Sequence, residues 1–381
     1  MSRRTLLLLT VAVVVLGCGV VLVRNGLGPP PEPPGPAPSA DASTAIDRRL
    51  VRLIDDLVGD LADAAPGGAP SGCFRCDAGP ALALASAAAV TRDRGRRDRA
   101  VAVFDEMIRS YQRKSGAFGP DHGSSDIDTM FFAAELGIAA VVLDDDLDPH
   151  HRQTWSASVA RAADFLVANG NLAWYTNGNI NVGNALVMAL AARLTGEPTY
   201  TVRYDQAIRF AIEPPLQRWP GLGLTVTREP TRADGSDGKG FFAEASTRGR
   251  AGYDPEYTML QLDQLTRIFL VNNDPRVLRA MNLLANQLLD RVDTTTWLLD
   301  TSGGTRGRRE RQPVPLDSAG LIALVELGGR ADLRHYIGDQ LTAIESHFRQ
   351  KAPELGDRMK YALGMTCSSI LMSLPTNARM R

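Results

Sequence analysis

The sequence predicts an all-α protein whose helices pair as hairpins and close into an (α/α)6 toroid. From Ser43 onward, apolar residues recur at the spacing of amphipathic helices, and the alternation typical of strands is scarce. The helical segments end in turn sequences such as Asn169-Gly170 and Asn273-Asp274-Pro275. The alternatives are a plain helical bundle and an open solenoid. No strict repeat of about 34 or 40 residues is present, which argues against a tetratricopeptide-type array.

Twelve helices are expected, and taken as sequential pairs they give the six hairpins of the toroid. Their approximate ranges are 46–61, 80–93, 98–112, 126–142, 150–168, 181–195, 199–213, 256–271, 275–292, 316–327, 331–349 and 357–373. The best candidate for a short strand is 222–227. The irregular segment Pro214–Gly252 is expected to be functional, because long loops in compact domains are usually functional or disordered.

Three segments are expected along the chain: an anchor at 1–24, a proline-rich linker at 25–43 and the toroid at 44–381. Thr5–Val23 is an uncharged apolar run of 19 residues, which is long enough to span a bilayer. The preceding Arg3 and Arg4 favour a cytoplasmic N-terminus. The toroid is therefore expected outside the cytoplasm, anchored to the membrane at a bacterial cell surface or in the periplasm.

Two alternatives for the N-terminus stay open. A cleaved signal peptide would release the protein in secreted form. Leu16-Gly17-Cys18 resembles a weak lipoprotein box, which would make the protein a lipoprotein. The proline-rich linker favours extended polyproline conformation and would act as a semi-rigid spacer.

Charge and cysteine content narrow the possible functions. The formal net charge is −1, which argues against a nucleic-acid-binding protein. Cys73 and Cys76 form a CxxC pair for which a local disulfide is expected outside the cytoplasm, and Cys367 is expected to be a buried thiol. No second CxxC or histidine pair completes a metal motif, so we expect neither a metal nor another cofactor.

A first group of candidate site residues lies at 174–184, where aromatic residues precede asparagines and glycines at the start of a helix. Side-chain amides can hydrogen-bond a carboxylate or a hydroxyl without adding charge. Helix capping by asparagine is the alternative interpretation. The residues are Trp174, Tyr175, Asn177, Asn179 and Asn181.

A second group lies at 233–265, where Asp234-Gly235-Ser236 precedes an acidic residue, two arginines and two tyrosines. A nearby arginine stabilises a phenolate and can lower the pKa of the tyrosine, which could then exchange a proton with a substrate. The alternative is two tyrosines packed on one helix face beside solvated arginines. The residues are Glu244, Arg248, Arg250, Tyr253, Glu256 and Tyr257, with Trp219 in the preceding loop.

Together the two groups resemble the toroidal polysaccharide lyases. NGNINVGNAL is similar to the asparagine motif of hyaluronate and chondroitin lyases, and ADGS followed by GYDPEYTMLQL is similar to their DGS-to-tyrosine segment. Alginate-lyase toroids show a related pattern. The resemblance covers 174–265 and implies β-elimination at a uronic acid of a polysaccharide. The protein is expected to be a monomer.

The resemblance also implies roles for single residues. Asn177 would neutralise the uronate carboxylate, and Arg248 or Arg250 would support the tyrosine. Tyr257 matches the catalytic tyrosine of the hyaluronate-lyase pattern and Tyr253 that of the alginate-lyase pattern. Such lyases usually carry a histidine near these motifs, and here only His122 lies in a plausible loop. Sugar contacts would come from Trp174, Tyr175, Asn179, Asn181, Trp219, Glu244 and Glu256.

Two other function classes remain open. A toroid glycoside hydrolase would use carboxylates flanking the scissile bond, and the candidates are Asp126, Asp128, Asp254 and Glu256. For Asp126 the alternative is ordinary placement at a helix start. A catalytically silent glycan-binding toroid is the third class. The basic loop 306–311 could meet an anionic polysaccharide or be a solvated surface loop.

Overall fold

A computed structural model describes residues 52, 78–119, 126–173, 175–215, 222–245, 251–293, 295–296, 298–305, 314–315, 320–334, 336–337, 342, 346 and 357–373. The chain divides at residue 43 into two units, and every described residue belongs to the second. The expected anchor, the linker and the Cys73–Cys76 pair lie outside the described residues. None of the helices in the described ranges is long and apolar enough to cross a membrane.

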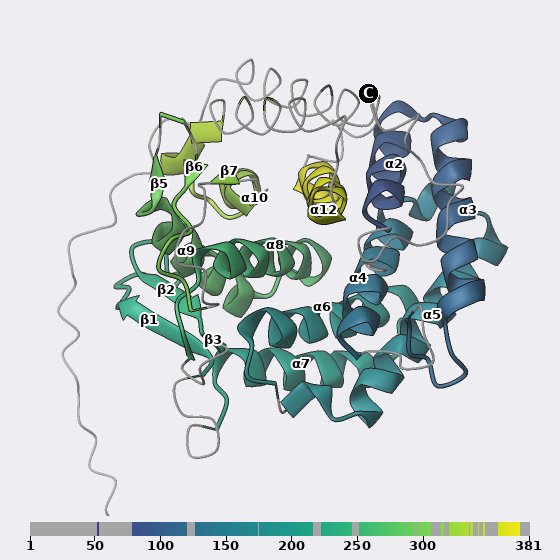
Figure 1. The fold of residues 1–381 in the computed structure, drawn as a ribbon, viewed down its shortest axis with the longest axis horizontal. Coiled ribbons are helices and arrows are strands. Elements are labelled where there is room, and N and C mark those ends of the chain that lie inside the picture. The colour runs from purple at the N-terminus through teal and green to yellow at the C-terminus, as the bar shows by residue number, and fades with distance from the viewer. Residues whose placement is uncertain are drawn as a thin grey trace, which may run out of the picture. The chain divides into compact units, whose positions relative to one another are not determined.

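The described helices form two concentric layers (Figure 1). Those of the inner layer contact one another in chain order, and the last contacts the first, which closes a ring. They are α2 (Ala78–Thr91), α4 (Asp126–Val142), α6 (Gly178–Thr195), α8 (Pro255–Asn272), α10 (Gly320–Glu326) and α12 (Asp357–Ser373). The expected α-helical toroid is therefore confirmed for the described part of the chain.

The outer layer packs against the inner one, each outer helix beside the inner helix that precedes it in the chain. It consists of α3 (Arg94–Tyr111), α5 (Pro149–Ala168), α7 (Pro198–Ile212) and α9 (Pro275–Leu289). Short 3-10 helices lie between these elements: η2 (Asp144–Asp146), η3 (Asn171–Ala173) and η4 (Ala331–Leu333). The predicted helix 331–349 lies mostly outside the described residues.

Composition explains which helices are inside. The inner helix α2 is rich in alanine and leucine, and its residues from Ala78 to Ala88 are all buried. The outer helix α3 is rich in arginine and buries only Ala100, Phe104 and Met107. A helix that is apolar all round belongs in a core, whereas one with a single apolar stripe belongs at a surface.

Close contacts between inner helices depend on glycine. A Cβ atom on Gly364 of α12 would lie 2.4 Å from the carbonyl oxygen of Gly79 in α2, so only glycine allows the two helices to meet there. Gly137 of α4 packs in the same way against Leu190 of α6. The first of these contacts lies where α12 closes the ring onto α2.

Neighbouring inner helices run in the same direction. Gly137 and Leu190 meet near the C-terminal halves of α4 and α6, and Gly183 in the first half of α6 would contact Met130 of α4 and Gln264 of α8. The first turns of α4, α6 and α8 therefore lie at one end of the ring. We call this end of the ring the N-terminal end, because α4, α6 and α8 begin there, at Asp126, Gly178 and Pro255.

The segment between α7 and α8 contains more strand than the sequence predicts. The expected strand is β1 (Leu224–Arg228), which pairs antiparallel with β2 (Lys239–Phe242), and β3 (Glu244–Ala245) pairs with β4 (Ala251–Gly252). After α9, three more short strands form a third antiparallel sheet: β5 (Val292–Asp293), β6 (Leu298–Leu299) and β7 (Val314–Pro315). Strands of two residues are too short to show an alternating pattern, so sequence analysis cannot detect them.

Several helix ends differ from the prediction. The predicted start of α3 is too late, because Asp93 caps the helix: its carboxylate accepts the backbone N–H groups of Gly95 and Arg96. The start of α6 is also earlier than predicted, at Gly178. That early start has a cause outside the helix, which is central to the candidate site.

Candidate active site

A buried carboxylate from a distant segment caps helix α6. Glu244 of β3 is fully buried, and its Oε1 accepts the backbone N–H of Asn179 at 2.8 Å. The first N–H groups of a helix need such a partner, and negative charge is favourable at this end. Capping is thus supplied by a residue 65 positions away in the sequence.

Because Glu244 caps α6, the side chain of Asn177 does not. Asn177 is the N-cap residue by position, but its side chain makes no capping hydrogen bond. Its Nδ2 instead donates to Glu244 Oε2 at 3.1 Å, and its Oδ1 accepts from the hydroxyl of Thr176 at 3.2 Å. The capping alternative is therefore wrong for Asn177, whose amide group is oriented by a buried carboxylate.

Glu244 also joins α6 to α8. Gln261 of α8 donates from Nε2 to Glu244 Oε1 at 2.8 Å and to the carbonyl oxygen of Phe242 at 3.3 Å. Gln261 is fully buried, and sequence analysis missed it. Its spacing of four residues from Tyr257 is the signal that could have found it, because residues i and i+4 share a helix face.

Tyr257 lies in the first turn of α8 and is half-buried. Its backbone N–H donates to Asp254 Oδ1 at 3.3 Å, and Asp254 is the fully buried N-cap of α8. Since Tyr257 and Gln261 share one face of α8, that face is the one that reaches Glu244. Asn177 contacts Glu244 directly, and Tyr257 lies one helical turn before Gln261, the α8 residue that contacts Glu244.

Tyr253 has a different environment. Its ring packs on Phe241 with 5.1 Å between centroids, and the guanidinium of Arg291 lies 5.9 Å from the ring centroid. Phe242, the next residue in β2, packs near Gly178 at the start of α6, and successive strand residues point to opposite faces. Tyr253 therefore lies on the face of β2 directed away from α6.

Burial governs the chemistry of Tyr253. Its hydroxyl is buried and has no hydrogen-bond partner among the described residues. Burial raises the pKa of Tyr253 above its ordinary value, an effect that Arg291 only partly offsets. A phenol in this environment stays protonated, and this is the opposite of the lowered pKa that a supporting arginine was expected to produce.

A second polar cluster lies at the start of α4. Asp126 Oδ2 accepts from the hydroxyl of Tyr175 and from Asn171 Nδ2, the latter at 3.1 Å. Burial and then the hydrogen bond to Asp126 raise the pKa of Tyr175. Asn181 donates to the carbonyl oxygen of Tyr175 at 3.1 Å. The segment before α6 is therefore tied to the start of α4, and Asn171 is a second residue that sequence analysis missed.

The Asp234-Gly235-Ser236 turn lies away from these groups. Asn282 of α9 donates to the carbonyl oxygen of Asp234 at 2.9 Å, and Asn286 donates to those of Ser236 and Gly238 at 2.9 and 2.8 Å. The turn is thus fastened to an outer helix and has a scaffolding role.

The structure joins Asn177 and Asn179 to Glu244, places Tyr257 one helical turn before Gln261 on α8, and leaves Tyr253 on another face. Asn179 contributes its backbone N–H to Glu244, and Glu256 is half-buried in the first turn of α8. Asp254 is a capping residue rather than a free carboxylate. Outside the described residues lie His122, Trp174, Trp219, Arg248, Arg250 and the arginines of 306–311.

Within the described ranges, no group of three or more histidine, cysteine, aspartate or glutamate side chains could hold a metal ion. Cys367 of α12 is a free thiol in the core, and burial raises its pKa to about 12. A thiol with such a pKa is not a ready nucleophile or metal ligand.

No protein-family model and no curated protein sequence matches the chain. Among solved structures, a polysaccharide lyase matches with a TM-score of 0.56 at 11% identity, over 86% of this chain and 96% of the other. A D-mannose isomerase matches with a TM-score of 0.56 at 13% identity, over 87% and 99% of the two chains.

A third neighbour is the chondroitin AC lyase of Streptomyces coelicolor A3, with a TM-score of 0.51 at 14% identity. The match covers 83% of this chain but 49% of the lyase, so the chain spans about half of that enzyme's length. All three neighbours are (α/α) toroid enzymes. At these identities the likeness concerns the fold, and the chain has the (α/α) toroid fold that these enzymes share.

Proposed function

We propose that the protein is an enzyme that degrades a uronic-acid-containing polysaccharide by β-elimination. The observation that carries the proposal is the release of Asn177 from helix capping by Glu244. An asparagine amide carries two N–H donors, and Glu244 takes one of them. The other is left for a ligand at the N-terminal end of the ring, where Tyr257 also lies.

In the proposed reaction, Asn177 donates a hydrogen bond to the uronate carboxylate, which makes the C5 proton more acidic. Tyr257, ionised to its phenolate, is the base that removes this proton and becomes a phenol in doing so. The electron pair forms the C4–C5 double bond, the C4–O bond breaks, and the leaving oxygen takes a proton from a tyrosine hydroxyl. Tyr257 is preferred to Tyr253 because it shares a helix face with Gln261, whereas the hydroxyl of Tyr253 is buried.

Charge balance suggests a role for the two arginines. A uronate placed at Asn177 would approach the buried Glu244, and like charges in a site of low dielectric repel strongly. Arg248 and Arg250 lie in the sequence between β3 and β4, the strand pair that carries Glu244. We therefore assign one of them the role of compensating cation, and we assign His122 a contribution to proton transfer.

The proposed location follows from the N-terminal sequence. The apolar run Thr5–Val23 and the proline-rich linker would hold a monomeric catalytic domain outside the cytoplasm, where polysaccharides are found. A lipoprotein or a secreted form would reach the same substrates.

Hydrolysis is the second candidate, and Asp126 favours it. This carboxylate lies at the N-terminal end of the ring beside Tyr175, and carboxylates flanking the scissile bond are what glycosidases use. Asp128 lies in the same first turn of α4. A silent glycan-binding toroid is the remaining outcome.

One assay separates the three. The full-length protein is incubated with uronate-containing and neutral polysaccharides while ultraviolet absorbance and reducing ends are both followed. Elimination yields absorbance from the C4–C5 double bond together with new ends. Reducing ends without absorbance would reject the lyase proposal and support Asp126, and binding without either product would support the silent toroid.

A further inference from the structure

A pocket lies at the end of the ring opposite the N-terminal end. It has a volume of about 240 Å³ and lies between the α2–α3 turn and η2. Ala88 belongs to the last turns of α2, and η2 follows the C-terminus of α4. Because inner helices run in one direction, this pocket is remote from Asn177 and Tyr257. It is lined by Ala88, Arg92, Asp93, Arg94, Arg97 and Asp146.

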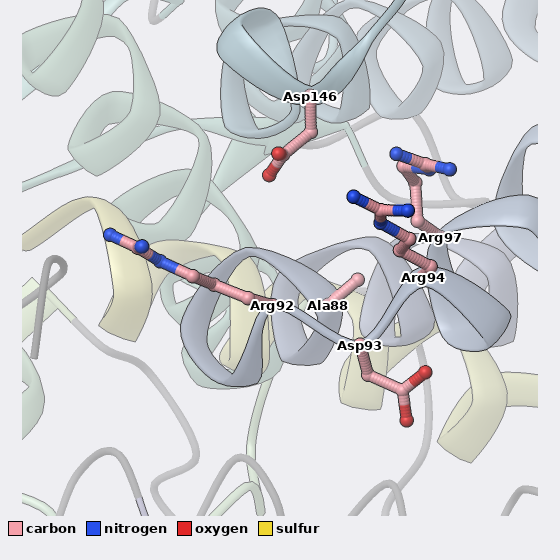
Figure 2. Close-up of a pocket in the computed structure, with 6 residues that line it drawn as sticks. All are labelled: Ala88, Arg92, Asp93, Arg94, Arg97 and Asp146. Carbon is pink, nitrogen blue, oxygen red and sulfur yellow. The ribbon is translucent and has the colours of Figure 1, made fainter.

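The walls of the pocket carry opposite charges. Figure 2 shows Arg94 and Arg97 together at the start of α3, Arg92 extending the other way, and the Asp146 carboxylate pointing into the space between Arg92 and Arg94. Arg94 and Arg97 are three residues apart, so they share a helix face. No ion pair joins Arg94 or Arg97 to Asp146 among the described residues, and Arg97 pairs instead with Asp98 at 2.7 Å.

This arrangement is not a bare helix N-terminus. The backbone N–H groups of Gly95 and Arg96 already donate to Asp93 Oδ1, at 2.8 and 3.2 Å. An anion in the pocket would therefore be bound by guanidinium groups. A guanidinium presents a planar pair of donors that matches a carboxylate, while the Asp146 carboxylate accepts only donors such as hydroxyl groups.

We propose that this pocket binds one acidic sugar residue, with its carboxylate on Arg94 and Arg97 and its hydroxyl groups on Asp146. The volume is below the usual range for drug-sized ligands, about 300–1,000 Å³, and suits a single sugar unit. The choice of a sugar acid rests on the proposed function, whereas the pairing of an anionic group with hydroxyl groups rests on the charges of the pocket. The site would hold a distant part of a polymeric substrate.

The test measures binding by the full-length protein carrying Tyr257→Phe, which prevents turnover in the proposed mechanism. The probes are glucuronate, glucose, glycine and inorganic sulfate, titrated calorimetrically. We expect glucuronate to bind better than the other three probes. Arg94→Ala and Arg97→Ala should each weaken glucuronate binding about tenfold or more, as loss of a hydrogen bond to a charged group does. Arg109→Ala is the matched control, because Arg109 is an exposed arginine of the same helix.

Asp146→Ala gives the sharpest readout, because its effects on two probes have opposite signs. Glucuronate should bind several-fold more weakly, since its hydroxyl groups lose an acceptor. Sulfate should bind more tightly, since a negative charge is removed. Three results would overturn the proposal. Glucose could bind as well as glucuronate, glycine or sulfate could bind better than glucuronate, or glucuronate binding could be unchanged in both arginine variants.

The outcome is separable from that of the proposed function. Loss of glucuronate binding in Arg94→Ala while the wild-type protein eliminates no substrate would leave the pocket assignment standing and reject the lyase. The opposite result is that the wild-type protein eliminates substrate while Arg94→Ala and Arg97→Ala leave glucuronate binding unchanged. That result would support the lyase and reject the pocket assignment.

Discussion

Two parts of the segment between α7 and α8 contribute to the molecule in different ways. The turn 234–238 is held by Asn282 and Asn286 on the outer helix α9. The β3–β4 pair, only a few residues later, places Glu244 against the inner helices α6 and α8. Both parts belong to one motif in the sequence, yet one is scaffold and the other shapes the candidate active site. Proximity in sequence is therefore a poor guide to shared function here.

The largest effect is expected from removing the buried carboxylate. Glu244→Ala leaves three donors without their acceptor, from Asn179, Gln261 and Asn177. Unsatisfied buried groups cost about 1–3 kcal/mol each, so the free energy of unfolding should fall by roughly 3–5 kcal/mol, and turnover should be lost. Urea denaturation and the elimination assay measure the two effects. A variant as stable as the wild type would contradict the capping role of Glu244.

A smaller and purely structural effect is expected from loosening the turn 234–238. Asn286→Ala removes hydrogen bonds to the carbonyl oxygens of Ser236 and Gly238 and an acceptor for Arg330. The free energy of unfolding should fall by about 2–3 kcal/mol, while kcat/KM per folded molecule stays near the wild-type value. A selective loss of turnover in this variant would show that the turn 234–238 belongs to the active site.

Acid should weaken the same turn region. Hydrogen bonds from the side chain of Thr231 and the backbone of Arg232 lower the pKa of Asp237 to about 2. Since this folded-state pKa lies below the unfolded value of about 3.9, Asp237 stabilises the fold above pH 4, and this contribution is lost as the pH falls toward 2. The difference in urea midpoint between wild type and Asp237→Asn should therefore shrink over that window. A difference independent of pH would contradict the assignment.

The smallest effect concerns the turn between α2 and α3. Arg92 has a left-handed backbone, with φ of 57°, and its N–H donates to the carbonyl oxygen of Ala88. Arg92→Gly should raise the free energy of unfolding by up to about 1 kcal/mol. The left-handed conformation costs a non-glycine residue about 1–2 kcal/mol, and glycine offsets part of this gain because it loses more conformational entropy on folding. Arg92→Ala is the control, since it removes the same side chain but keeps the strain. Equal stability of the two variants would exclude strain at this position.

The sequence predicts the helices of this fold well because their apolar spacing is a local property. The range predicted for the last helix, 357–373, agrees with α12. The prediction is poorest where an element depends on distant residues. The early start of α6 requires Glu244, which lies 65 positions from Asn179. The residues around Asn177 contain no pattern that predicts this contact.

The candidate site shows the same limit. The two tyrosines of GYDPEYTMLQL are equivalent in the sequence, and only packing against Phe241 and Arg291 distinguishes Tyr253 from Tyr257. For Gln261 the sequence offers only its spacing of four residues from Tyr257, and its role becomes visible once its partner Glu244 is known. The role of the turn 234–238 was likewise hidden, because the donors that hold it come from α9.

The most direct test of the account compares Tyr257→Phe with Tyr253→Phe in the elimination assay, with thermal unfolding measured on both. We expect Tyr257→Phe to lower kcat by about 10²–10⁴-fold, the contribution of a general acid–base group, with an unchanged melting temperature. Tyr253→Phe should keep most of the turnover, because its hydroxyl is buried and meets no hydrogen-bond partner in the described part of the chain. Full activity in Tyr257→Phe, or loss of activity confined to Tyr253→Phe, would contradict the assignment of the catalytic tyrosine.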